Sequence, residues 1–242
     1  MSLISTIFHT ILYQPLFNAL VLIYEYLPGK DFGLSIIVLT LVIRFILYPL
    51  AVKSIKSQRA INRIQPKVKA LQEKYKNDKE RQAKEMMALW KEEKVNPFGG
   101  LFLVLIQLPI LIAIYQVFRF GFQKEQLVWL YHFLPSPGEI NPFFLGLVNL
   151  SLPNVVLSII AGITQFIQAK MMTRRMPQST KSDASSMIQK QMIYFFPIFT
   201  ALIMMRFASA ISLYWAVSNI FSIVQEYFIS KKEIKAKELK TS

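Results

Sequence analysis

Cysteine is absent from the 242 residues of this sequence. Its absence excludes disulfide bonds, thiolate metal sites, a lipid-modified cysteine and a thiol nucleophile. The two histidines, His9 and His132, both fall outside the expected membrane core. The sequence has no His-Glu-x-x-His, Gly-x-Ser-x-Gly or Gly-x4-Gly-Lys-Ser/Thr pattern. We therefore expect no catalytic residue, no bound metal and no cofactor, and we disfavour an intramembrane protease.

Basic residues are missing from the amino-terminal segment, where Lys30 is the first to occur. A cleaved signal peptide begins with a positively charged segment, and an organelle transit peptide is rich in arginine. We therefore expect the chain to be mature from Met1.

Apolar residues are abundant, since 53% of the chain is hydrophobic. Five apolar stretches approach the length of about 20 residues that a membrane-crossing helix needs. They predict an all-α integral membrane protein with a five-helix transmembrane core, an N-terminal interfacial helix and a cytoplasmic helical hairpin. The predicted segments are the interfacial helix at 1–32, spans at 33–52, 99–122, 150–172, 191–206 and 207–230, the hairpin at 53–98, an external loop at 123–149, a cytoplasmic loop at 173–190 and a basic tail at 231–242.

The first 27 residues are apolar but are interrupted by His9, Gln14, Pro15, Asn18 and Glu25. These interruptions favour a helix that lies in the membrane interface. A sixth span is the alternative. It would turn within 28–32 and leave every later loop on the same side, so the loop charges do not distinguish the two.

The hairpin segment is too polar for lipid, contains a single proline at position 66, and has its expected turn at 76–78. Together with the tail and the cytoplasmic loop, the latter counted from Lys170 at the end of the preceding span, it carries 23 of the 28 basic residues, whereas four lie on the opposite side. Because basic residues in short loops mark the cytoplasmic side, we expect an external amino terminus and a cytoplasmic carboxyl terminus. The same placement explains the basic excess without nucleic-acid binding.

Several motifs follow one another in a single order along nearly the whole chain. They are Ser35-Ile36-Ile37 with Thr40, Arg44, Tyr48 and Pro49; Gln65-Pro66-Lys67; Glu85-Met86-Met87-Ala88-Leu89; Lys94-Val95-Asn96-Pro97-Phe98-Gly99-Gly100; Gln107, Pro109 and Tyr115; Leu213-Tyr214; and Val217-Ser218-Asn219. In this order and spacing the chain resembles the YidC/Oxa/Alb family of membrane protein insertases. The resemblance implies a bacterial plasma-membrane protein that inserts and helps to fold other membrane proteins, alone or with the Sec translocon.

The chain departs from that family at two places. Phe207-Ala208-Ser209-Ala210 stands where relatives commonly have Phe-Pro-Ser/Ala-Gly, so we expect a remodelled turn there. The large periplasmic domain of many Gram-negative relatives and the lipid-modified cysteine of many Gram-positive ones have no counterpart. The resemblance is therefore to the compact five-span form.

Arg44 is the one basic residue that falls well inside a predicted span, since Arg119, Lys170 and Arg206 lie within the last four residues of theirs. An arginine at mid-span costs about 2.5–3.5 kcal/mol on insertion scales unless water or a partner receives it. No acidic residue lies at the centre of another span, and Glu226 lies near a cytoplasmic end, so we expect a water-filled groove around Arg44. The alternative is a guanidinium that reaches the headgroups or backbone carbonyls. Thr40 lies one turn earlier on the same face, and the resemblance implies a groove open to cytoplasm and lipid only.

Polar residues on other spans are further groove candidates. The resemblance assigns substrate contact to Trp215. For the remaining candidates on these spans, the alternative role is interhelical hydrogen bonding or packing. Gln107, Pro109 and Pro197 are expected to be structural, the two prolines as kinks. The remaining groove candidates are Gln165, Gln168, Tyr214 and Asn219.

The hairpin carries apolar residues near helical spacing, flanked by the basic residues Lys56, Arg59, Arg63 and Lys67. They form either a solvated, self-packed hairpin or a cytoplasmic docking surface. The resemblance implies as partners nascent membrane-protein substrates, the ribosome, the Sec translocon, the signal-recognition-particle receptor and anionic lipids. The basic tail could contact the ribosome or lipid without sequence specificity.

A small-solute transporter or channel is the main rival function, because an arginine in a polar cavity could bind an anion. Transporters often have two related halves with paired broken helices. No such repeat is evident in the sequence.

Overall fold

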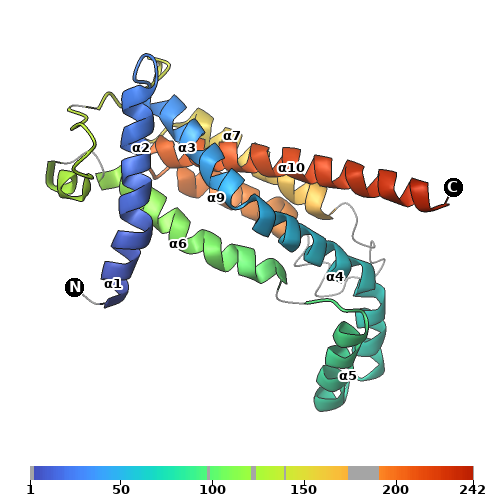
Figure 1. The fold of residues 1–242 in the computed structure, drawn as a ribbon. Coiled ribbons are helices and arrows are strands. Elements are labelled where there is room, and N and C mark those ends of the chain that lie inside the picture. The colour runs from blue at the N-terminus through green and yellow to red at the C-terminus, as the bar shows by residue number, and fades with distance from the viewer. Residues whose placement is uncertain (1–2, 97–98, 121–123, 139, 174–190, 242) are drawn as a thin grey trace.

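The computed structural model describes residues 3–96, 99–120, 124–138, 140–173 and 191–241 (Figure 1). The predicted all-α class is confirmed, since one short hairpin is the only sheet in these ranges. The elements are α1 (Leu3–Phe8), η1 (His9–Tyr13), α2 (Gln14–Tyr26), α3 (Phe32–Ile46), α4 (Tyr48–Lys74), α5 (Lys79–Glu92), α6 (Gly99–Phe120), η2 (Lys124–Trp129), β1 (Phe143–Phe144), β2 (Val148–Asn149), α7 (Val155–Thr173), η3 (Gln191–Phe195), α9 (Phe196–Met204) and α10 (Ser209–Thr241).

The segment formed by α1, η1 and α2 runs across one end of the other helices (Figure 1). Its buried face includes Tyr13, Phe17 and Val21, which belong to the main apolar core. Asn18 is also buried and bonds to the loop that follows η2. Its Nδ2 donates to the Trp129 carbonyl at 2.8 Å, and its Oδ1 accepts from the Tyr131 amide at 2.7 Å. The segment is therefore packed onto the bundle and the loop.

By length and composition, residues 5–26 and 155–172 could each cross a membrane, and so could α3 and α4 if they form one broken span. Shorter apolar helices cover 105–119 and 193–204. Helix α10 begins at Ser209 and continues to Thr241, so the predicted tail extends the last helix. The predicted cytoplasmic loop lies, from residue 174 to 190, outside the described residues. The number of spans stays a prediction.

A bend of 62° at Leu47 separates α3 from α4. Helix α3 starts at Asp31, whose side chain accepts a hydrogen bond from the Leu34 amide at 2.8 Å. Pro49 lies in the first turn of α4, where its missing amide proton leaves no helical bond unmade. The range predicted for the first span, 33–52, therefore contains the bend as well as the first turn of α4.

Helices α4 and α5 form a hairpin at the end of the molecule opposite to α2, where the carboxyl end of α10 also lies (Figure 1). A separate apolar cluster of Ile64, Val68, Leu89 and Val95 packs the hairpin on itself. Its turn lies between α4 and α5, around the predicted position 76–78, and Asp78 caps α5. The hairpin thus has its own small core.

Helix α7 packs closely against both α10 and α9. A Cβ added at Gly162 would lie 2.9 Å from the Ala201 Cβ and 3.0 Å from the Pro197 carbonyl oxygen. Glycine therefore permits the close approach of α7 and α9 at this point.

Candidate functional site

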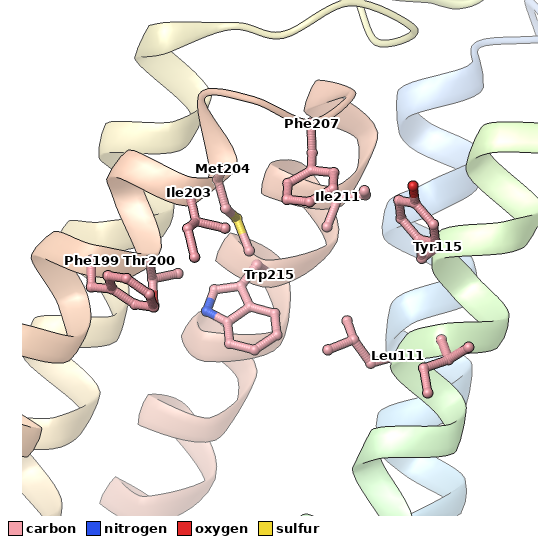
Figure 2. A pocket seen from close by; sticks show the side chains of 10 residues that line it. Leu111, Tyr115, Phe199, Thr200, Ile203, Met204, Phe207, Ile211 and Trp215 are labelled. Atoms are coloured by element: carbon pink, nitrogen blue, oxygen red, sulfur yellow. The ribbon is translucent and has the colours of Figure 1, made fainter.

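An apolar pocket of about 370 Å³ lies between α6 on one side and α9 and α10 on the other (Figure 2). Helix α10 contributes Trp215, whose ring reaches into the space between the two walls (Figure 2). The other lining residues come from α6, α9, the turn after α9 and the start of α10, and they are Leu111, Ile112, Tyr115, Phe199, Thr200, Ile203, Met204, Phe207 and Ile211.

The walls of the pocket are open to the outside of the bundle. Ile112 is 49% exposed, and Ile203 of the opposite wall is 41% exposed. At one end the rings of Tyr115 and Phe207 meet edge to face, with centroids 5.8 Å apart. An open apolar trough of this kind can take up another apolar surface, such as a helix or acyl chains.

Hydrogen bonds fix the orientation of Trp215. Its Nε1 donates to Gln165 Oε1 of α7 at 3.0 Å, which satisfies the polar edge of the indole. One turn further along α10, Asn219 donates to the Ala161 carbonyl and to Thr164 Oγ1, both at 3.3 Å. These bonds join α7 and α10, so Gln165 and Asn219 act here as interhelical links.

Arg44 lies in the last turn of α3, just before the bend, and is half-buried. Its Nε is buried and has no hydrogen-bond partner among the described residues. The guanidinium is close enough to the Tyr214 hydroxyl of α10 for an electrostatic interaction. That hydroxyl accepts a hydrogen bond from Gln107 Nε2 of α6 at 2.7 Å. Three helices thus bring Arg44, Gln107 and Tyr214 together.

Helix α10 carries further buried polar residues beyond Tyr214, towards the end of the molecule that holds the hairpin. Ser218 and Gln225 are buried; the Ser218 hydroxyl lies near that of Tyr214, and the Gln225 Nε2 has no hydrogen-bond partner in the described part of the chain. Buried polar atoms cost free energy unless they are bonded, and water is the usual partner where protein groups are missing.

The structure places the remaining groove candidates at different points. Thr40 is 1% exposed, and its hydroxyl donates to the Ile36 carbonyl of its own helix at 2.6 Å. Gln168 lies on α7 one turn after Gln165, is half-buried and makes no hydrogen bond within the described residues. Neither side chain joins the Arg44 cluster through a bond.

The three residues expected to be structural have distinct settings. Pro109 lies inside α6, and Pro197 lies in the first turn of α9, directly after the π-helix η3. Gln107 bonds to Tyr214, so it is part of the cluster around Arg44. The sequence offered no sign of this pairing, because the two residues are 107 positions apart.

Arg59 stands apart from the other basic residues of the hairpin. Its Nη2 donates to Glu226 Oε1 at 2.5 Å and to Ser230 Oγ at 2.7 Å, both on α10. The Arg59 and Glu226 side chains are only 14% and 11% exposed. The sequence did not predict this buried ion pair, since it indicated only that Glu226 lies near a cytoplasmic end.

The three other predicted docking residues are exposed. Lys67 Nζ lies 2.5 Å from Glu93 Oε1, and Arg63 lies 3.8 Å from the other oxygen of that carboxylate. The hydrogen bond and charge of Lys67 lower the pKa of Glu93, and Glu93 in turn raises the pKa of Lys67. Lys56 is exposed on α4. These side chains form a basic surface on the hairpin.

Comparison with known proteins decides the family, because the family model described as "60Kd inner membrane protein" matches residues 22–237. The chain belongs to the YidC/Oxa family. Membrane protein insertase YidC of Fusobacterium nucleatum is 37% identical over 202 residues, which cover 84% of this chain and 87% of that protein.

Longer YidC/Oxa relatives match over the same region. Proteins named membrane protein insertase YidC from Geobacter sulfurreducens and Rickettsia bellii are 33% and 31% identical. The matches cover 90% and 91% of this chain but only 37% and 39% of those proteins. This YidC/Oxa chain therefore spans most of the length of the Fusobacterium relative and well under half of the other two. Relatives and apolar helices together identify a membrane-embedded protein.

Proposed function

We propose that this chain is a membrane protein insertase of the bacterial inner membrane, which passes a polar tail of its substrate along the Arg44 cluster while the apolar helix of the substrate occupies the trough lined by Trp215. The names of the relatives, membrane protein insertase YidC, support the insertase role. The two-surface mechanism and the cooperation with a Sec translocon are parts of the proposal.

The observation that carries the proposal is the placement of two successive residues of α10. Tyr214 is 1% exposed and faces Arg44 and Gln107, while Trp215 lines the apolar trough between α6 and α9 (Figure 2). Successive residues of a helix point about 100° apart, so α10 presents a polar side and an apolar side at the same depth. A substrate has both kinds of segment and needs both surfaces at once.

Electrostatics explain why a hydrated Arg44 cluster would help a polar tail to cross the membrane. A charged residue at the bilayer centre costs about 2.5–3.5 kcal/mol on insertion scales. Water around Arg44 would reduce that cost for the arginine and for a passing tail. The positive charge would also attract acidic residues of the tail during their passage. Neither step consumes a nucleotide.

The direction of insertion depends on the orientation of the chain. We infer that the amino terminus is external and the hairpin cytoplasmic, with Lys56, Arg63 and Lys67 available for a ribosome, a targeting receptor, the Sec translocon or anionic lipid. Arg59 is less suited to this role, because its guanidinium is engaged with α10. Thr40 and Gln168 remain proposed groove residues, and Gln165 and Asn219 are proposed to support the groove through helix pairing.

Substitutions at Arg44 test the charge mechanism. Arg44→Lys should retain much of the insertion of acidic-tailed substrates, Arg44→Ala should lose it, and Arg44→Glu should lose more through repulsion. Arg81→Ala, at an exposed position on α5 of the hairpin and away from both surfaces, is the matched control. Insertion is measured in liposomes containing the purified variant, with its thermal stability measured in parallel. If the alanine variant is stable and inserts acidic-tailed substrates normally, charge attraction is wrong.

Crosslinking tests the apolar trough separately. Single cysteines at Leu111 and Ile203 should crosslink to the apolar helix of a stalled substrate, whereas a cysteine at Val156, which is 64% exposed on α7, should not. Equal crosslinking at all three positions would contradict a defined trough. The same liposomes distinguish the rival function, because a transporter would move a small anion and would leave a small membrane protein unintegrated.

A further inference from the structure

The external loop carries a short β-hairpin whose tip exposes two leucines. Strands β1 and β2 pair antiparallel, and the turn between them is closed by a hydrogen bond from the Leu147 amide to the Phe144 carbonyl at 2.9 Å. Leu147 is 81% exposed and Leu145 is 59% exposed. Large apolar side chains with so little protein contact call for a partner surface.

Two successive residues at the tip have positive φ angles, and one of them is a leucine. Leu145 has φ +51° and Gly146 has φ +68°, the sign pattern of a type I′ turn. Asparagine or glycine normally occupies the first of these positions, because a leucine Cβ is unfavourable at positive φ. A leucine here makes the turn less stable than asparagine would, so its apolar side chain is the feature that needs an explanation.

The hairpin is fixed to the bundle on both sides. The Leu145 amide donates to Asp31 Oδ2 at 2.5 Å, while the other oxygen of Asp31 caps α3. A Cβ added at Gly33 would lie only 2.1 Å from the Phe144 ring, which shows how closely β1 packs on α3. After β2, the carbonyl of Leu150 accepts from the Ala210 amide of α10 at 3.1 Å. The β-hairpin therefore holds the two tip leucines in a fixed position relative to α3 and α10.

Lipid is the partner that the surroundings favour. No charged residue occurs between 140 and 169, a stretch that runs from the hairpin through most of α7. Beyond the tip, Leu152, Val155 and Val156 are 59%, 56% and 64% exposed, so the exposed apolar surface continues onto the outer face of a helix that is long and apolar enough to cross a membrane. The rim of a protein interface is polar and usually carries charged residues, and residues 140–169 contain none.

We infer that the tip formed by Leu145, Gly146 and Leu147 inserts into the acyl region of the leaflet next to the amino-terminal end of α7. It lies beside the carboxyl end of α2, since the Asn141 amide donates to the Tyr24 hydroxyl at 3.0 Å. Hydrogen bonds attach the β-hairpin to Asp31 and to the start of α10. The inserted tip therefore sets the depth of α3 and α10, and with it that of Arg44 and Trp215, relative to the lipid surface. This role rests on the proposed function only in naming that leaflet as the outer one.

The absence of cysteine allows a direct test with the full chain in lipid nanodiscs. Leu145→Cys and Leu147→Cys, each labelled with an environment-sensitive fluorophore, report on the tip. Ile159→Cys on the outer face of α7 is the lipid reference, and Gln72→Cys, exposed on the α4–α5 hairpin, is the aqueous reference. Quenching is measured with spin-labelled lipids and, separately, with iodide.

Both tip labels should behave like Ile159→Cys, with several-fold stronger quenching by spin-labelled lipid and several-fold weaker quenching by iodide than Gln72→Cys. Thermal unfolding of each labelled variant should match the parent chain, because the substituted side chains are exposed. Tip labels that match Gln72→Cys while Ile159→Cys reports lipid would overturn the inference and leave the tip as a surface for a protein. If Ile159→Cys also reported water, the membrane placement of α7 in the proposed function would be wrong.

Discussion

Breaking the buried ion pair between Arg59 and Glu226 should release the hairpin from the last helix. The two residues are 167 positions apart and join α4 to α10 near the end of the bundle that carries the hairpin. Ser230 accepts a second hydrogen bond from the same Arg59 nitrogen at 2.7 Å. Glu226→Gln removes the carboxylate charge while nearly preserving side-chain volume.

The expected cost follows from burial. With side chains only 14% and 11% exposed, the pair is well removed from water. Removing one partner of a buried ion pair typically costs about 3–5 kcal/mol, because the remaining charge is left without compensation. Residual exposure and the bond to Ser230 favour the lower end, about 3 kcal/mol, or roughly a hundredfold in the folding equilibrium. Replacing both residues, Arg59→Met with Glu226→Leu, should cost less, because no charge is left buried.

Thermal and denaturant unfolding in nanodiscs measures these costs, and a double-mutant cycle isolates the coupling. The exchanged pair, Arg59→Glu with Glu226→Arg, should recover part of the lost stability. Arg63→Gln is the matched control, since the Arg63 side chain is 73% exposed. If Glu226→Gln destabilises the chain no more than Arg63→Gln does, the pair contributes little and the reasoning from burial is wrong.

Three further predictions concern other parts of the chain. Gly33→Ala should destabilise the fold by about 1–3 kcal/mol in thermal unfolding, because the new Cβ would clash with the Phe144 ring; an unchanged melting temperature would contradict the close packing. In a variant with Trp90 as sole tryptophan, fluorescence should report the contribution of the Lys67–Glu93 pair to hairpin stability. This contribution should be lost as the pH falls from about 4.5 through the lowered pKa of Glu93, and also as the pH rises from about 10.5 through the raised pKa of Lys67. Glu93→Gln should abolish both losses. Neutralising the five lysines of the basic tail should weaken ribosome co-sedimentation most at low salt, and an effect independent of salt would exclude simple electrostatics.

The candidate site was only partly predictable. Arg44 was identifiable from sequence because a single charge in an apolar helix is costly wherever the helix packs. Its neighbours were not identifiable in this way: Gln107 was expected to serve its own helix, yet it bonds to Tyr214. Gln165 and Trp215 were both placed among groove candidates, but their mutual hydrogen bond depends on how α7 and α10 pack. Helical spacing gives the face on which a residue lies, and not the helix that this face meets.

Composition and local pattern determined the all-α class, the apolar helices, the polar hairpin and the exceptional position of Arg44, because each depends on residues close together in the chain. The tertiary structure alone decided the bend at Leu47, the pairing of Arg59 with Glu226, and the trough between α6 and α9. The ion pair and the trough arise where segments distant in sequence meet. Their outcome depends on side-chain shape and on the desolvation of charges in three dimensions, which no local pattern records.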